Sequence, residues 1–494
     1  MKPYGAITRC PLILLVVITG LLSGCAANPV TGDSDFVMMS EADEIAMGRN
    51  AHPEVLKQYA VYDNQPLQDY IQEVGEKLAA NSHRSNLIYR FTLLDSVEVN
   101  AFALPGGYIY ITRGLLAYLN SEAELAAVLG HEIGHVTARH SVRQISAARA
   151  ASIGYAIGSI FSPGLGTQLG QNVFNILGNA WLSGYGREHE LEADRLGAEY
   201  LARSGYDPQA MIGVIGVLKD QEEFERQLAK EEGRDPHIYH GVFASHPDND
   251  ARLQEVVASA EAFRTEESTT VNREPFLHMI DGLVFGNSER DGILRGNTFY
   301  HHDLGIALTL PSEWHVDNLP DRIVARINSG DALLQISTED LNKRISPREF
   351  MEERLKLKEI GAGEEIHPDG LDGYTGIAQL RRTPFGSRKG RVSVVFFNDR
   401  AFIFVGATKD KGSPEPEDEA FLAAVNSFHA LTAEEQILAR AIRLKIVSAE
   451  SGMSFAELAT QSRLHSHAEE QLRLLNHYYP GGEPEPGQLI KIVE

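Results

Sequence analysis

Cysteine is nearly absent from this chain. Among 494 residues there are only Cys10 and Cys25. Cys10 lies in an N-terminal segment that we expect to be removed, and Cys25 lies in a motif typical of lipid attachment. The mature protein would therefore have no free thiol and no disulfide. The cysteines then supply neither a nucleophile nor a metal ligand, so any chemistry must come from histidine, carboxylate and hydroxyl groups.

Positive charge and long apolar runs are also scarce. The 45 Lys and Arg residues stand against 68 Asp and Glu residues, which gives a formal net charge of -23. A nucleic-acid partner would need a basic face, so this balance argues against one.

The apolar run at residues 11–22 is too short to cross a bilayer, and no other run reaches the roughly 20 residues required. We expect the remainder of the chain to be soluble.

The N-terminus has the pattern of an export signal. Lys2 and Arg9 precede the apolar run 11–22, as in a signal peptide. The run leads into Leu-Ser-Gly-Cys25, which resembles a bacterial lipobox, in which the cysteine is lipidated and becomes the first mature residue. A plain signal peptide with a nearby cysteine is the alternative. Ala26, which follows the cysteine, resembles the residue found there in lipoproteins sorted to the outer membrane. We therefore expect the protein to be lipid-anchored at the periplasmic face of the outer membrane.

Changes in residue composition and in the spacing of apolar residues along the chain predict an α+β protein with several domains. The mainly helical part is expected to contain a small sheet with strands at 89–94 and 108–112. The later part has short strand-like runs, and it resembles the PsbP-like α/β sandwich. The expected division is a signal peptide (1–24), a tether (25–39), a helical domain (40–265), a linker (266–295), a smaller α/β domain (296–432) and a βααβ tail (440–494).

One motif in the helical part indicates metal chemistry. Residues 130–135 read Gly-His-Glu-Ile-Gly-His and contain H-E-x-x-H. Residues four apart on a helix share a face and lie about 6 Å apart along its axis, so His131 and His135 can bind one Zn²⁺. Glu132 falls beside them, where a carboxylate can take a proton from water at the metal. A surface helix with two unrelated histidines is the alternative.

A third ligand is expected in the acidic segment 187–197. A catalytic zinc normally has three protein ligands and one open position. Helical spacing puts Glu190 and Asp194 on one face, whereas Glu192 falls on a second face that looks solvated. We therefore expect Glu190 to bind the metal and Asp194 to accept a hydrogen bond from a ligand histidine. His189 as the ligand, and a wholly solvated acidic helix, are the alternatives.

These motifs together resemble a known family. H-E-x-x-H followed by E-x-x-x-D resembles the gluzincin metallopeptidases. The runs at 100–107, 112–116 and 245–247, with Arg252, make the sequence similar to the HtpX and CAAX-prenyl-protease family, and most of all to its soluble periplasmic branch. The resemblance covers about residues 40–260. HtpX and the prenyl proteases have membrane helices in the catalytic chain, whereas this sequence has none.

The resemblance implies roles for further residues. Asn100, Ala101 and Phe102 would lie on an edge strand that binds the substrate backbone by β-augmentation. This mode suits cleavage of extended or unfolded chains with little sequence preference. Arg187 would position the helix of the third ligand or pair with Asp194.

Two more side chains are candidates close to the metal. In the soluble branch a loop histidine such as His246 can occupy the open zinc position and block it; a turn histidine is the alternative. By the same resemblance, Arg252 and His246 are also candidates for stabilising the oxyanion. His140, by contrast, is expected on the helix surface.

The βααβ tail resembles a LysM-like module. A Gly/Pro-rich turn precedes its closing strand, and such modules often bind peptidoglycan. The glycine-aspartate pair usual before the first helix is Gly452-Met453 here. A structural cap and a protein-docking module are the alternatives.

The combined prediction is a zinc-dependent endopeptidase with one Zn²⁺ per chain. Glu132 would take a proton from water and pass it to the leaving amine. The expected substrates are unfolded or misassembled envelope and outer-membrane proteins. The alternatives are a latent protease, blocked by His246, that acts mainly as a chaperone or assembly factor, and a scaffold bound to peptidoglycan.

Overall fold

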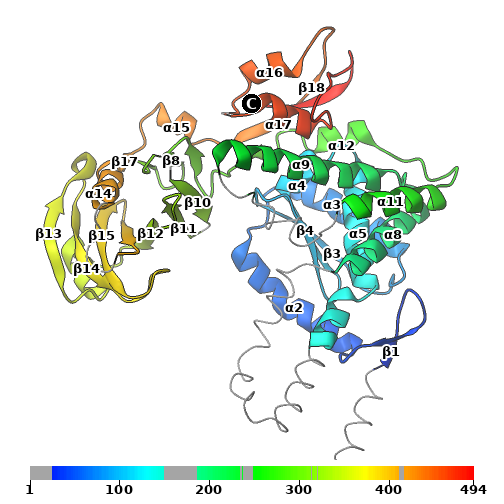
Figure 1. The fold of residues 1–494 in the computed structure, drawn as a ribbon, viewed down its shortest axis with the longest axis horizontal. Helices are drawn as coiled ribbons and strands as arrows, with labels where there is room; N and C mark the ends of the chain where they lie inside the picture. The colour runs from blue at the N-terminus through cyan, green and yellow to red at the C-terminus, as the bar shows by residue number, and fades with distance from the viewer. Residues whose placement is uncertain are drawn as a thin grey trace, which may run out of the picture. The chain divides into compact units, whose positions relative to one another are not determined.

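The computed structural model describes residues 25–148, 186–233, 236, 249–312, 314–319, 321–410, 417–464 and 466–494. The chain divides into two compact units, unit 1 (Met1–Leu283 with Arg443–Glu494) and unit 2 (Val284–Ile442) (Figure 1). Both helices and strands are present, as an α+β chain requires. Within the described residues no helix combines the length and apolarity needed to cross a membrane.

Unit 1 is mainly helical and includes the C-terminal tail. Its elements are β1 (Cys25–Ala27), β2 (Ser34–Phe36), α2 (Glu41–Gln58), α3 (Gln65–Ala80), β3 (Arg90–Leu94), β4 (Ala101–Leu104), β5 (Tyr108–Thr112), α4 (Arg113–Tyr118), α5 (Glu122–Thr137), α8 (Arg187–Arg203), α9 (Ala210–Glu232), α11 (Asn249–Phe263), α12 (Arg273–Met279), β18 (Ile442–Ser448), α16 (Phe455–Gln461), α17 (Ala468–Leu475) and β19 (Leu489–Val493).

A three-stranded sheet supports the helices of unit 1. The strand order is β3-β5-β4, with β3 parallel and β4 antiparallel to the central β5. β5 has aromatic and β-branched residues throughout and is buried along its whole length, which suits a central strand. β4 lies at the edge of this sheet and contacts α5. The sheet therefore brings an edge strand next to the helix that contains H-E-x-x-H.

Helices α5 and α8 cross at very short range because small residues line their contact. α5 begins at Ser121, whose hydroxyl accepts from the Glu124 N–H. A Cβ on Gly134 of α5 would lie 2.9 Å from the Ala193 carbonyl oxygen of α8, closer than real Cβ atoms approach. A Cβ on Gly197 of α8 would lie 3.1 Å from the His131 nitrogen. The missing side chains let the two helix backbones approach each other at the level of the metal-binding motifs.

The expected linker is partly folded. Helix α12 lies within residues 266–295, and its Phe276 and Leu277 are fully buried. Charged residues surround these apolar ones in the sequence, so the short run has too little periodicity to predict a packed helix.

The tail has the βααβ order β18-α16-α17-β19, with β18 and β19 antiparallel. It packs on the corner between α4 and α5. The buried Lys491 Nζ donates to the carbonyl oxygens of Ala117 at 2.7 Å and Leu119 at 2.9 Å. Asn120 Nδ2 donates to the Leu475 carbonyl at 3.0 Å. The tail is therefore continuous with unit 1 and shares buried polar contacts with it.

Unit 2 is built from antiparallel strands. One sheet has the order β10-β11-β12-β16-β15-β14-β13 and another has the order β17-β9-β8-β7. The elements are β6 (Val284–Phe285), β7 (Ile293–Arg295), β8 (Thr298–His301), β9 (Ile306–Thr309), β10 (His315–Leu319), β11 (Arg322–Arg326), β12 (Ala332–Asp340), α13 (Pro347–Glu353), β13 (Ile360–Ile366), η2 (Pro368–Gly370), β14 (Gly373–Leu380), β15 (Arg388–Phe397), β16 (Arg400–Thr408), α14 (Asp418–Asn426), β17 (His429–Ala430) and α15 (Glu435–Leu438).

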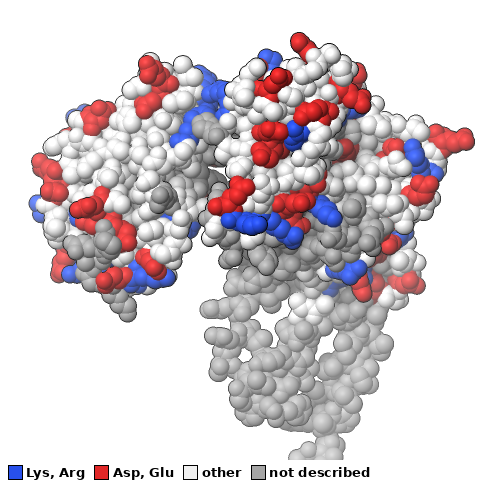
Figure 2. All heavy atoms as spheres, turned by 45° about the horizontal axis from the view of Figure 1, so that its top comes forward, with Lys and Arg blue, Asp and Glu red and all other residues white. Residues whose placement is uncertain are grey.

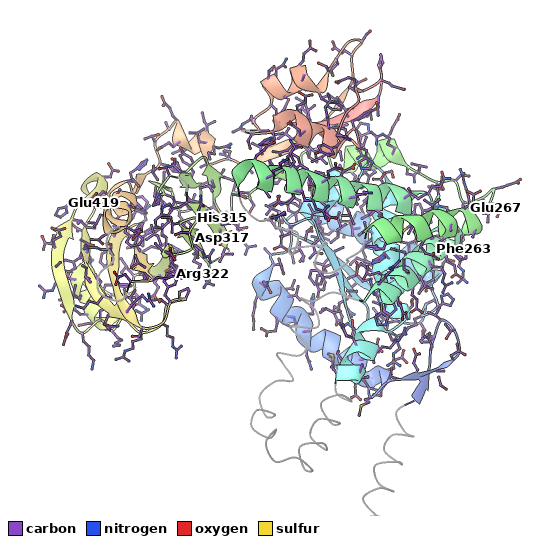
Figure 3. All side chains as sticks on the ribbon, viewed as in Figure 1. Phe263, Glu267, His315, Asp317, Arg322 and Glu419 are labelled. Carbon is purple, nitrogen blue, oxygen red and sulfur yellow. The ribbon has the colours of Figure 1, made fainter. Side chains whose placement is uncertain are left out.

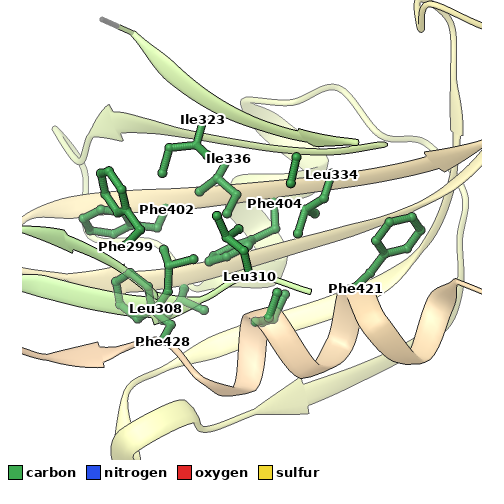
Figure 4. Packing of buried hydrophobic residues seen from close by; sticks show 14 of the residues in the cluster. Phe299, Leu308, Leu310, Ile323, Leu334, Ile336, Phe402, Phe404, Phe421 and Phe428 are labelled. Carbon is green, nitrogen blue, oxygen red and sulfur yellow. The ribbon is translucent and has the colours of Figure 1, made fainter. Parts of the chain in front are cut away.

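Apolar side chains cover both faces of the seven-stranded sheet. In β16, Phe402 and Phe404 belong to one cluster and Ile403 belongs to another, as the alternation of a strand requires. The first cluster includes Phe421 of α14 and residues of β8 and β9 (Figure 4). The second includes Phe350 and Met351 of α13. Unit 2 is therefore a layered α/β arrangement.

The drawn surface carries charges of both signs. Acidic and basic side chains are interspersed over the described residues on the face of Figure 2.

In unit 2, His315 and Asp317 share one face of β10, with His315 Nε2 3.1 Å from Asp317 Oδ1 (Figure 3). Such exposed pairs contribute little to stability.

Candidate metal centre

Two helices of unit 1 bring together the three predicted ligands. His131 and His135 lie one turn apart on α5, and Glu190 lies in the first turn of α8. Their exposed fractions are 6%, 2% and 0%. One ligand atom from each lies within 4.8 Å of the others. Three buried donors therefore converge from two helices.

The spacing of the donor atoms fits a small divalent cation. His131 Nε2 and His135 Nε2 are 2.9 Å apart, and each is 3.5 Å from an oxygen of Glu190. Ligands bound tetrahedrally to zinc at about 2.0–2.1 Å would lie roughly 3.3 Å from one another. Two nitrogens and one carboxylate are also a donor set that zinc accepts, and three protein ligands are the usual number at a catalytic zinc.

A buried ion pair orients His131. Its Nδ1 lies 2.8 Å from Asp194 Oδ1, and Arg252 donates to both oxygens of Asp194, from Nε at 2.8 Å and Nη2 at 2.7 Å. Burial alone would raise the pKa of Asp194, but Arg252 and His131 outweigh it and hold the pKa below its ordinary value. The ionised carboxylate only accepts, so His131 Nδ1 donates and its Nε2 lone pair faces the cluster.

Arg252 reaches the site from α11 and also lies 3.5 Å from Glu190 Oε2 through Nη1. The resemblance implied that Arg252 stabilises the oxyanion, whereas its two-pronged contact is with Asp194. Arg187 was expected to position α8, the helix that contains Glu190. It is the first residue of α8, and its side chain is exposed.

Glu132 is buried beside His131 and lines a small apolar pocket. The cavity volume is about 30 Å³, more than the ~10–15 Å³ that one water needs. Ala101 of β4 lines the same pocket, together with Met211, Val214, Ile215 and Leu218 of α9. A carboxylate and an imidazole of the candidate centre thus face an apolar space next to the edge strand.

The remaining predicted residues have mixed outcomes. Asn100 directly precedes β4, and Ala101 and Phe102 lie in it, at the edge of the sheet. His246 lies outside the described residues, as does the side chain of Cys25. His189, the alternative ligand, is half-buried, and its ring stacks on that of His140 at 4.3 Å between centroids.

His140 was expected on the surface, but it is fully buried and contacts a predicted ligand. Its Nδ1 lies 2.8 Å from His135 Nδ1, and its Nε2 lies 3.0 Å from Glu192 Oε2. The expectation was wrong because α5 does not continue to His140. Arg139 has a φ of 55°, and the chain turns there before helix resumes. A regular helical period continued past this turn therefore assigns His140 to the wrong face.

The chain was compared with known proteins. Residues 66–260 match Peptidase family M48. The β-barrel assembly-enhancing protease of Escherichia coli is 32% identical over 243 residues, 48% of this chain and 47% of the relative. That of Yersinia pestis is 33% identical over 211 residues, 42% and 43% of the two chains. The mitochondrial metalloendopeptidase OMA1 of Schizosaccharomyces pombe is 31% identical over 185 residues, 37% of this chain and 54% of the relative.

The alignment spans about half the length of these curated relatives. Among solved structures, cyanobacterial PsbP from Synechocystis matches with a TM-score of 0.22 at 14% identity, covering 28% of this chain and 96% of that one. A TM-score this low assigns no fold.

Proposed function

We propose that the chain is a member of peptidase family M48, whose model matches residues 66–260, and that it is an endopeptidase with one zinc ion held by His131, His135 and Glu190. The observation that supports this most directly is the convergence of three buried donors at separations of 2.9–3.5 Å. Few structural roles would account for two imidazoles and a carboxylate meeting in a dry site.

The side chains around the site suit peptide hydrolysis. When bound, zinc polarises a carbonyl and lowers the pKa of a water molecule. Glu132, buried beside His131, takes a proton from water and returns it to the leaving amine. The Asp194 carboxylate holds the ring of His131. The substrate backbone lies along β4, next to the small apolar pocket beside Glu132.

The test of this function is Glu132→Gln. The amide keeps the shape but cannot accept the proton, so hydrolysis of an unfolded protein such as casein should fall by about 10²–10⁴-fold. Zinc content should be retained, because Glu132 is not a proposed ligand. Glu188→Gln, on the exposed side of α8, is the matched control and should behave like the wild type. Equal activity of Glu132→Gln and the wild type would contradict the proposal.

We further propose that the protein acts in the bacterial envelope on unfolded or misassembled outer-membrane proteins. The relatives named β-barrel assembly-enhancing proteases and the lipobox-like motif at Cys25 support this location. Cys25→Ser should move the protein from the outer-membrane fraction to the soluble periplasm. In a deletion strain, Glu132→Gln should fail to rescue envelope defects; full rescue would favour a chaperone or assembly role instead.

The βααβ tail is proposed to bind peptidoglycan. Its element order supports a LysM-like module. The protein should sediment with purified peptidoglycan sacculi, and recovery of all of it in the supernatant would reduce the tail to a structural part of unit 1.

A further inference from the structure

We propose that His140 and Glu192 form a relay that orients the metal ligand His135 and holds it in the tautomer that binds metal. This inference rests on the proposed metal centre and assigns a positioning role to two residues outside its ligand set. Three contacts in series support it: His135 Nδ1 to His140 Nδ1 at 2.8 Å, His140 Nε2 to Glu192 Oε2 at 3.0 Å, and Arg143 Nη1 to Glu192 Oε2 at 3.0 Å.

Hydrogen-bond chemistry fixes the direction of this series. The Glu192 carboxylate, paired with Arg143, only accepts, so His140 must donate from Nε2. A neutral His140 then has a lone pair at Nδ1. His135 must therefore donate from Nδ1 to His140, which leaves the lone pair of His135 on Nε2, the atom that faces His131 and Glu190.

The backbone around His140 is built to hold this ring. Arg139, at φ 55°, interrupts the helix after α5, and its Nε donates to the buried Glu44 at 2.9 Å. The ring of His189 stacks on the ring of His140 at an interplanar angle of 17°. The stack thus restrains the fully buried ring of His140, and the Arg139–Glu44 contact restrains the turn next to it.

The relay also gives each of three acidic residues on α8 a separate role. Glu192 follows Glu190 by two residues, about 200° around the helix, so it cannot reach the same point. It reaches His140 instead, on the far side of His135. Asp194, four residues after Glu190, contacts His131 directly. The E-x-E-x-D pattern therefore provides one ligand and one carboxylate for each ligand histidine, a direct one for His131 and an indirect one for His135.

The relay is tested by zinc affinity, measured by competition with a chelator. His140→Phe fills the space but cannot accept from His135, so zinc should bind about 10–100-fold more weakly. His140→Asn places an amide oxygen near the position of Nδ1 and should stay within about 3-fold of the wild type. The absorption spectrum of the Co²⁺-loaded protein should shift in His140→Phe and be preserved in His140→Asn. His315→Phe, an exposed histidine in unit 2, is the control substitution.

A second pair of variants covers the case in which His140→Phe does not fold. Glu192 is partly exposed, with 21% of its side chain accessible, so its replacement should leave the zinc-free protein folded, as circular dichroism can verify. Glu192→Gln keeps a carbonyl acceptor for His140 and should bind zinc nearly normally. Glu192→Met has no such acceptor and should bind it about 10-fold more weakly.

The outcomes separate the relay from the metal centre. Wild-type protein that binds no zinc would overturn the proposed centre itself. Normal zinc affinity in His140→Phe or in Glu192→Met would overturn the relay alone. Equal weakening in His140→Phe and His140→Asn would also overturn it, because packing rather than hydrogen bonding would then be responsible.

Discussion

At the scale of single residues, the Asp194–Arg252 ion pair holds the ring of the predicted ligand His131 in place. Both side chains are almost fully buried, and the guanidinium contacts both carboxylate oxygens. Arg252→Met would leave Asp194 charged in a dry site, which typically costs about 3–5 kcal/mol. Arg252→Lys should recover little, because an ammonium cannot make the two-pronged contact. Denaturant unfolding of the zinc-free variants measures both effects.

A matched control lies just past the end of the same helix. Arg264 pairs with Asp207 at 3.6 Å, with 44% of its side chain exposed. Arg264→Met should therefore cost less than about 1 kcal/mol. If the two methionine variants lost similar stability, the burial of the Asp194 pair would not be responsible for the effect.

The residues around the candidate centre show what a sequence can and cannot predict. Helical spacing singles out Glu190 and Asp194 because both lie on one continuous helix, and the structure brings them to His131. The same spacing misses His140, because the left-handed residue Arg139 interrupts the period. It also assigns Glu192 to solvent, because helical spacing within α8 carries no information about His140, which lies outside that helix.

At the scale of elements, the distance between α5 and α8 sets the distance between the ligands. Gly134→Ala would place a Cβ 2.9 Å from the Ala193 carbonyl oxygen, so the helices must move apart by a few tenths of an ångström. Glu190 would move away from His131 and His135. We expect weaker zinc binding and a loss of about 1–3 kcal/mol in stability, measured by chelator competition and by thermal unfolding.

Gly216→Ala is the matched control for this substitution. Gly216 lies within α9, and a Cβ there would meet nothing within 4 Å. Since alanine is the better helix former, this variant should gain up to about 1 kcal/mol and bind zinc normally. Zinc affinity in Gly134→Ala equal to that in Gly216→Ala would contradict the role given to the helix crossing.

Strands were predicted more reliably than connections. The run 108–112 is strand β5, because aromatic and β-branched residues at a sheet centre leave few other choices. Helix α12 was not predicted, because it lies in the expected linker and its burial depends on α5 and β19, which are far away in the sequence.

At the scale of the whole molecule, the tail is expected to stabilise the rest of unit 1. Lys491 is completely buried and donates to the carbonyls of Ala117 and Leu119, on either side of the end of α4. Lys491→Met would leave these acceptors without that donor, at a cost of about 1–3 kcal/mol. Lys445→Met removes an exposed tail lysine and should be nearly neutral. Thermal unfolding that is insensitive to Lys491→Met would argue for an independent tail.

The same junction predicts a dependence of stability on pH. His477 donates from Nε2 to the Tyr118 carbonyl at 3.0 Å, and burial, with Lys491 and Arg273 adding to it, lowers the pKa of His477 to about 3. Between pH 6.5 and 3 the unfolded chain binds a proton at this residue that the folded chain does not. Its contribution to stability is therefore complete above pH 6.5 and falls by about 1.4 kcal/mol for each pH unit below it.

The effect can be isolated by comparing the wild type with His477→Gln. Glutamine can donate to Tyr118 from nearly the same position but does not titrate. At pH 7.5 the variant should be within about 1 kcal/mol of the wild type. At pH 5 the wild type should have lost about 2 kcal/mol more than the variant, as measured by denaturant unfolding. Parallel pH profiles for the two proteins would mean that the fold does not lower the pKa of His477.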